Sequence, residues 1–161
     1  MTRSDARHIA VHMIFSLGFG TEKVDTVLEQ ELNKERFHEL SEELGLYGQY
    51  PNAKQETYIR NLVKGVFVHG PELDEYIAKY AVGWSFERIP RMAAAIMRTA
   101  MYEILYLPEV PNAAAINAAV ELCKEYEPKE VVSFVNGILG TFVRTEFQDT
   151  PPKPEKTTEE E

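Results

Sequence analysis

The side chains of this 161-residue chain best suited to metal binding or nucleophilic chemistry are four histidines and one cysteine. Only His8 and His12 lie one helical turn apart, and no HExxH motif accompanies them, whereas zinc sites gather several Cys, His and carboxylate ligands. Cys123 has no histidine nearby in the sequence that could activate its thiol. We therefore expect no metal site and no cysteine nucleophile, and we predict that Cys123 packs in the core.

Other forms of catalysis are equally unsupported. Carboxylates are plentiful, but they fall on the solvated faces of predicted helices, and no two of them are singled out as an acid/base pair. The sequence contains neither GxxxxGK[ST] nor GxGxxG, the glycine-rich patterns that hold phosphates between a strand and a helix. We expect a protein that is not an enzyme and that holds no cofactor.

Phe134 is the residue most suggestive of binding. On a helix it lies about 80° from the apolar stripe of its own segment, one turn after Glu130. One interpretation is that the ring packs at the edge of the core. The other is that it stacks on an unpaired RNA base, because aromatic rings beside polar groups make such contacts.

Two asparagines and two glycines also interrupt apolar segments. Asn117 follows Ile116, and Asn136 precedes Gly137 and Gly140 in a segment that is otherwise apolar. A glycine inside a helix costs on the order of 1 kcal/mol, so its presence needs a reason. We interpret the glycines as points of close helix packing, with the amides hydrogen-bonded to neighbouring backbone or caps.

These residues must be positioned by helices, because apolar residues recur at spacings of three and four and no sustained two-residue alternation predicts a strand. We predict an all-helical protein of about seven helices. The expected segments are 4–19, 21–32 with helical composition continuing to 44, 54–69, 71–82, 90–107, 112–127 and about 129–143. Two glycines and a proline at 45–51 predict an exposed loop.

The first of these helices, which Ser4 could cap, carries apolar residues on two faces. A stripe that runs from Ala6 to Leu17 lies opposite Val11, Phe15 and Phe19. The helix is either buried on both sides, as in the centre of a bundle, or it presents an aromatic docking surface. Both interpretations stay open from the sequence.

Charge and hydropathy restrict the mode of RNA binding and the cellular compartment that we expect. The net charge of −9 is unfavourable for nucleic-acid binding through the overall field of the protein, so any RNA contact must be local. Residues 148–161 are rich in acids and prolines, a composition typical of a disordered tail. No signal peptide or membrane-spanning run is evident, and the single cysteine suits a reducing compartment, so we expect a cytoplasmic protein without membrane association.

Longer motifs carry a family resemblance. The runs RTAMYEILYLPEVPNAAAINAAVELCK and FVNGILG, with ARHIAVHMIF near the start, closely resemble the NusB family of bacterial transcription antitermination factors over residues 3–143. The resemblance implies one domain over residues 1–147 that consists of two three-helix bundles sharing a long interface. The N-terminal bundle would span about 4–82 and the C-terminal bundle about 83–147, with the junction near Gly83.

The resemblance also implies a function. Members bind boxA, a single-stranded element of ribosomal RNA leader transcripts, together with the ribosomal protein NusE, and help RNA polymerase to resist termination. A homodimer is a further possibility that the family suggests. Position by position, the implied RNA contacts are Arg3, Arg7, Glu130, Ser133 and Phe134, and the implied partner contacts are Phe15 and Phe19.

Two alternatives remain. Asp5 stands between Arg3 and Arg7, where the family has a more continuous basic segment, so the chain could be a helical adaptor that has lost RNA binding. A NusB-like domain also serves as the RNA-binding module of some ribosomal RNA methyltransferases. That hypothesis requires a catalytic domain, for which this sequence has no glycine-rich loop.

Overall fold

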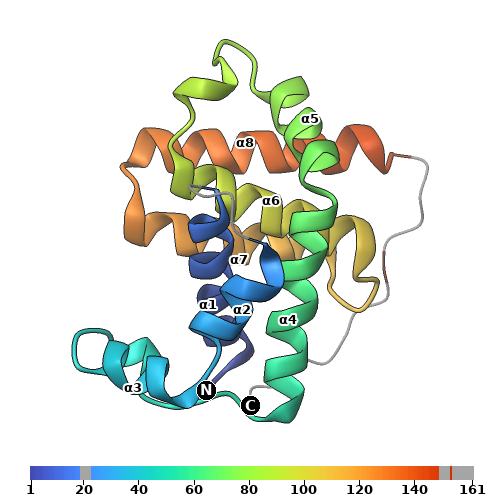
Figure 1. Ribbon diagram of the computed structural model, residues 1–161. Coiled ribbons are helices and arrows are strands. Elements are labelled where there is room, and N and C mark those ends of the chain that lie inside the picture. The colour runs from blue at the N-terminus through green and yellow to red at the C-terminus, as the bar shows by residue number, and fades with distance from the viewer. Residues whose placement is uncertain (19–22, 149–152, 154–161) are drawn as a thin grey trace. The chain divides into compact units, whose positions relative to one another are not determined.

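The computed structural model describes residues 1–18, 23–148 and 153, and this part of the chain contains helices and no strands (Figure 1). The prediction of an all-helical fold is confirmed. The described residues form eight α-helices and two short 3-10 helices. They are α1 (Arg3–Leu17), α2 (Val24–Glu31), α3 (Lys34–Ser41), η1 (Gly45–Tyr47), α4 (Ala53–Val68), α5 (Gly70–Tyr80), η2 (Phe86–Arg88), α6 (Arg91–Tyr106), α7 (Asn112–Tyr126) and α8 (Lys129–Glu146).

The additional helix arises from a break that the sequence analysis did not predict. The segment expected to stay helical from 21 to 44 divides into α2 and α3 at Leu32 and Asn33. Asn33 adopts an extended backbone, and its side chain accepts a hydrogen bond from the Arg36 N–H at 2.9 Å. Asparagine is among the best N-cap residues, because its side chain satisfies a backbone donor that a helix start leaves free. Asn33 therefore starts a new helix.

The segment between α3 and α4 is also more ordered than the exposed loop that its glycines suggested. Gly45–Tyr47 form the 3-10 helix η1, and Tyr47 is buried. Its ring packs edge-to-face on Phe37, with ring centroids 4.9 Å apart. The prediction was wrong for Tyr47, because turn residues indicate where a chain bends and not which neighbouring side chains are covered.

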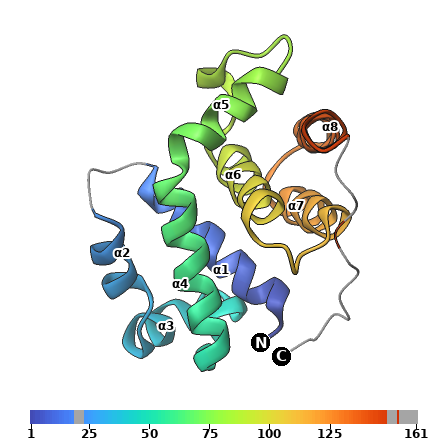
Figure 2. The ribbon, with the colours of Figure 1, turned by 90° about the vertical axis from the view of Figure 1, so that its right-hand side faces the viewer.

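The chain divides into two compact units, one formed by residues 1–67 and the other by the described residues from Val68 onward. In the first unit α2 packs against α1 and α3. In the second unit α6, α7 and α8 pack against one another, and α5 packs on both α6 and α8 (Figure 2). The bundle boundary expected near Gly83 remains a prediction.

Helix α6 is the buried centre of the second unit. Its sequence is apolar around most of the circumference, and ten of its residues are buried. One of them is the carboxylic acid Glu103. A helix this apolar around its circumference is covered by neighbours on several sides.

Two further observations complete the fold. None of the helices in the described ranges is long and apolar enough to cross a membrane. Of the predicted disordered tail, residues 148–161, only Gln148 and Lys153 are described, and the rest lies outside the described residues. The Lys153 ammonium donates to the backbone carbonyls of Glu103, Leu107 and Val110 at 3.0–3.2 Å.

Candidate nucleic-acid interface

Helix α8 presents one buried and one exposed face. Pro128 is its N-cap, and a single apolar stripe that includes Val131 and Val135 is buried. Glu130 and Ser133 lie off this stripe and are exposed. The structure therefore places both of these predicted RNA contacts on the accessible face of one helix.

Phe134 is half-buried, and another aromatic ring covers it. Trp84 packs on it with ring centroids 4.5 Å apart and an interplanar angle of 34°. Trp84 itself remains 38% exposed. The sequence alone did not predict this contact. The one available signal was the presence of the chain's single tryptophan in a turn.

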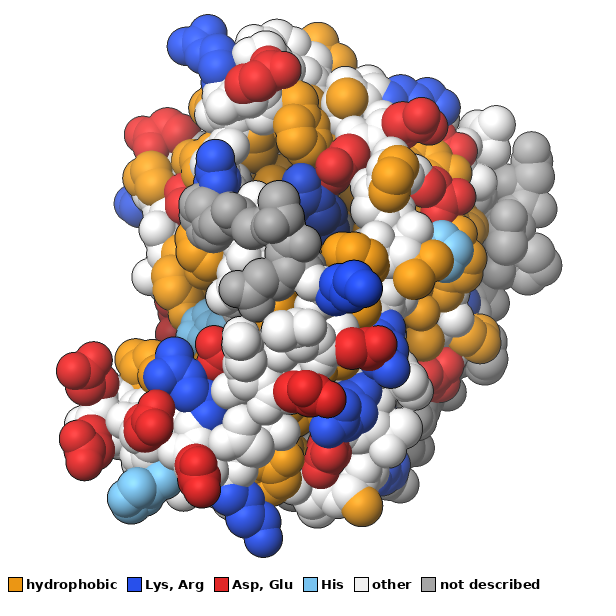
Figure 3. All heavy atoms as spheres, in the orientation of Figure 1, with side chains coloured by type: hydrophobic (Ala, Val, Ile, Leu, Met, Phe, Trp, Pro, Cys, Tyr) orange, Lys and Arg blue, Asp and Glu red, His pale blue; other side chains and the backbone are white. Residues whose placement is uncertain are grey.

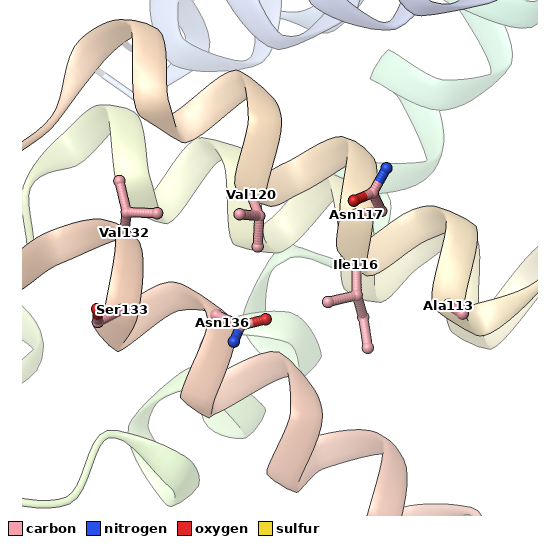
Figure 4. Close-up of a pocket in the computed structure, with 7 residues that line it drawn as sticks. All are labelled: Ala113, Ile116, Asn117, Val120, Val132, Ser133 and Asn136. Atoms are coloured by element: carbon pink, nitrogen blue, oxygen red, sulfur yellow. The ribbon is translucent and has the colours of Figure 1, made fainter. Parts of the chain in front are cut away.

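A groove of about 370 Å³ runs along α7 and α8 in the second unit (Figure 4). In the close-up, Ile116 and Val120 point from α7 toward α8, and Val132 points from α8 toward α7. The groove therefore has an apolar floor with uncharged polar groups around it. Its lining residues are Ala113, Ile116, Asn117, Val120, Val132, Ser133 and Asn136.

The interpretation of Gly137 as a point of close helix packing was wrong, and the two asparagines lie at the surface. Asn117, Asn136 and Gly137 are all exposed, and a Cβ added to Gly137 would meet nothing within 4 Å. A Cβ on Gly140 would come within 3.0 Å of the Arg144 guanidinium, which is the end of a flexible side chain. The sequence pattern locates these residues on helices but does not show which face the neighbouring helix leaves open.

The other predicted RNA contacts lie at the start of α1. The Arg3 guanidinium sits over the ring of Tyr58, 4.2 Å from its centroid, and is half-buried. Arg7, one turn further along, is also half-buried and engaged in contacts within the protein. The predicted RNA contacts therefore fall into two groups, one in each compact unit.

The acid between these arginines has a structural role. Thr2 is the N-cap of α1, not Ser4 as the sequence suggested. The Thr2 hydroxyl accepts from the Asp5 N–H at 3.0 Å, and the Asp5 carboxylate accepts from the Thr2 N–H at 2.9 Å. This is a reciprocal capping box. Asp5 therefore stabilises the helix start, and it also reduces the positive charge beside Arg3 and Arg7.

The middle of α1 is covered on both sides, as one of the two interpretations required. Val11 is buried on the face opposite Ile9, and Phe15 is half-buried. The role of Phe15 in partner binding remains a prediction, and Phe19 lies outside the described residues.

The histidine pair on α1 is a packing feature. The rings of His8 and His12 make an edge contact with centroids 4.7 Å apart, and His12 Nδ1 lies 2.7 Å from the Tyr47 hydroxyl. Burial, and to a lesser extent the charge of His8, lowers the pKa of His12 to about 4. No group of three or more potential metal ligands occurs within the described part of the chain.

Cys123 is buried on α7, which confirms the packing prediction. Burial, together with the nearby Glu127 carboxylate, raises the pKa of its thiol to about 11. The thiolate is the nucleophilic form of cysteine. The side chain is therefore protonated and unreactive at neutral pH.

Comparison with solved structures defines the class of this fold. The chain superimposes on T. maritima NusB with a TM-score of 0.75 and 24% identity, covering 90% of this chain and 92% of that one. A second match is a crystal structure of antitermination factors NusB and NusE in complex with dsRNA. Its TM-score is 0.70 at 22% identity, covering 88% of this chain and 96% of that one. The protein is an all-helical protein of the NusB fold.

Sequence comparison identifies the family. The model of the NusB family matches residues 4–144, and the chain belongs to that family. A curated relative, the transcription antitermination protein NusB of Carboxydothermus hydrogenoformans, is 38% identical over 87% of this chain and 91% of its own length. Proteins of this family are non-catalytic antitermination factors, in agreement with the prediction that the chain is not an enzyme.

Proposed function

We propose that this protein is a cytoplasmic transcription antitermination factor that binds boxA-type single-stranded RNA together with the ribosomal protein NusE, as part of an RNA polymerase antitermination complex. The observation that carries the proposal is the family match over residues 4–144. The accessible face of α8 supports it, because the exposed Glu130 and Ser133 flank the aromatic pair there.

The chemistry of this face suits bases better than phosphates. Glu130 is negatively charged and repels phosphate, but a carboxylate accepts hydrogen bonds from the exocyclic amines of bases. The amides of Asn117 and Asn136 both donate and accept, so they can pair with base edges that a single strand exposes. Phe134 and Trp84 add a surface for stacking. We infer that this region reads bases, whereas Arg3 and Arg7 hold the backbone.

The surface charge supports a local RNA contact and not a broad one. Acidic and basic side chains are interspersed over α3 and its surroundings in the lower part of Figure 3. Several of them pair, for example Arg36 with Glu31 at 2.8 Å and with Glu39 at 3.2 Å. Because Asp and Glu outnumber Lys and Arg by 26 to 17 and some cations are already paired within the protein, affinity for RNA alone will be weak, at micromolar dissociation constants or above. NusE should therefore contribute strongly.

Fluorescence anisotropy with a labelled boxA-type oligonucleotide tests this proposal. We expect weak binding to the protein alone, tighter binding once NusE is added, and loss of affinity as salt rises. An oligonucleotide of scrambled sequence is the control for specificity. Equal affinity for the two oligonucleotides in the presence of NusE would contradict the proposed function.

A helical adaptor without RNA binding is the second candidate, and the net charge of −9 together with Asp5 favours it. It predicts that NusE binds while boxA-type RNA has no effect on the complex. Light scattering of the protein, with and without NusE, would establish the stoichiometry and detect a homodimer. Stabilisation of the complex by boxA-type RNA in a salt-dependent manner would exclude the adaptor.

A further inference from the structure

Trp84 is held in a defined position at the surface. Helix α5 ends at Tyr80, and Gly83 follows with a φ of +85°, a conformation that favours glycine. This turn brings the Trp84 N–H to 3.1 Å from the carbonyl of Ala81. The backbone that carries the indole is therefore fixed by a turn.

The residues after Trp84 are anchored as well. Ile89 is buried, and the ring of Phe86 faces the Arg98 guanidinium at 5.8 Å. Arg98 in turn donates to the Asp74 carboxylate on α5 at 2.6 Å. The segment is thus attached to both α5 and α6, and Trp84 needs little reorganisation to receive a ligand.

The rings of Trp84 and Phe134 differ in how much surface they offer for stacking. Phe134 is half-buried and rises from α8, and Trp84 covers it at 4.5 Å while staying 38% exposed. A base cannot lie on the face of Phe134 that Trp84 occupies. The more accessible ring of the pair belongs to Trp84.

Resting on the proposed function, we propose that Trp84 is the stacking residue of the RNA site: one unpaired base lies on the exposed indole, and Phe134 supports the indole from beneath. A flat, preorganised aromatic surface beside exposed polar groups is the arrangement that captures splayed bases of single strands. The bases of a duplex are already stacked on one another, so duplex RNA offers no such base.

The intrinsic fluorescence of the wild-type protein provides the first test, because Trp84 is its only tryptophan. Single-stranded boxA-type RNA should quench the emission with the same concentration dependence as binding measured by anisotropy. A duplex of the same sequence should quench it far less. Binding without quenching, or equal quenching by the duplex, would overturn the inference and leave the proposed function intact.

Substitutions give the second test. Trp84→Ala should weaken binding of the single strand roughly 5- to 150-fold, the range for one stacked base, and Trp84→Phe should restore most of the affinity. Tyr106 is the matched control, because it is also 38% exposed and stacks on another ring, that of His69 at 4.2 Å. Tyr106→Ala should change binding by less than about twofold on the same scale.

Thermal melting of each variant separates loss of binding from loss of folding. If Trp84→Ala and Tyr106→Ala are folded and bind RNA equally well, the inference is wrong. If Trp84→Ala does not fold, the quenching of tryptophan fluorescence in the wild-type protein tests the inference by itself. If the wild-type protein binds no RNA, even with NusE, the proposed function fails and this inference fails with it.

Discussion

The start of α1 and the exposed face of α8 were both predicted to contact RNA, yet the structure gives them different properties. At α1, Arg3 lies on Tyr58, and Asp5 closes a capping box between the two arginines. At α8, the exposed groups are polar and mostly uncharged, and they lie beside an aromatic pair and a groove. A basic residue in a motif can already be engaged within the protein, whereas an aromatic pair and a groove become visible only in the tertiary structure.

The first prediction tests the role of the α8 face in RNA binding. Phe134→Ala removes the ring that supports Trp84. In the presence of NusE, it should weaken the binding of boxA-type RNA by about 1–3 kcal/mol. The dependence of affinity on salt should stay unchanged, because no phosphate contact is lost. Anisotropy at several salt concentrations measures both quantities. Unchanged affinity in a folded variant would remove Phe134 from the site.

The second prediction concerns α1, where His12 is half-buried and its pKa is lowered to about 4. The unfolded chain takes up this proton near pH 6.5, but the native protein does so only near pH 4. The contribution of His12 to stability is therefore complete above pH 6.5 and is lost as the pH falls toward 4. Urea unfolding should show a loss of roughly 2 kcal/mol between pH 7.5 and 5 from this group.

Two variants sharpen this test. His12→Gln keeps a neutral polar side chain near Tyr47 and should flatten the pH dependence of stability between pH 6.5 and 4. His38 is exposed on α3, so His38→Gln is the matched control and should leave the dependence unchanged. Equal pH dependence in the two variants would show that His12 does not titrate abnormally.

A third prediction concerns the groove beside α8. Asn136→Ala removes one exposed amide without disturbing the buried stripe, so it should reduce discrimination between boxA-type and scrambled RNA by about 1–2 kcal/mol. Asn61 is an exposed asparagine on α4 in the other unit, and Asn61→Ala provides the control. Competition binding with the two oligonucleotides measures the difference. Discrimination that persists in Asn136→Ala would show that the groove does not read bases.

The smallest effects are expected from the arginines. Arg3→Gln and Arg7→Gln should each lower the salt slope of binding by about 0.7, with little change in base preference. Arg60→Gln is the control variant, because the Arg60 side chain is also half-buried and pairs with the Glu56 carboxylate at 3.1 Å. If either α1 variant alters base preference while its slope stays unchanged, the proposed division between α1 and α8 is wrong.

The sequence alone determined much of the fold. Helical periodicity, prolines and glycines predicted the helical class and most helix positions. The runs RTAMYEILYLPEVPNAAAINAAVELCK and FVNGILG indicated the NusB family, to which the chain belongs. The sequence also placed Glu130, Ser133 and Phe134 on one helix. These features are local, because they depend on residues three or four positions apart.

Only the tertiary structure decided which groups are accessible. It paired Trp84 with Phe134 across 50 positions of sequence and exposed Asn117 and Asn136 in a groove. It also buried Tyr47 in a segment expected to be an exposed loop. Exposure depends on how neighbouring helices cover one another, and helical periodicity contains no information about which part of a face a neighbour leaves open.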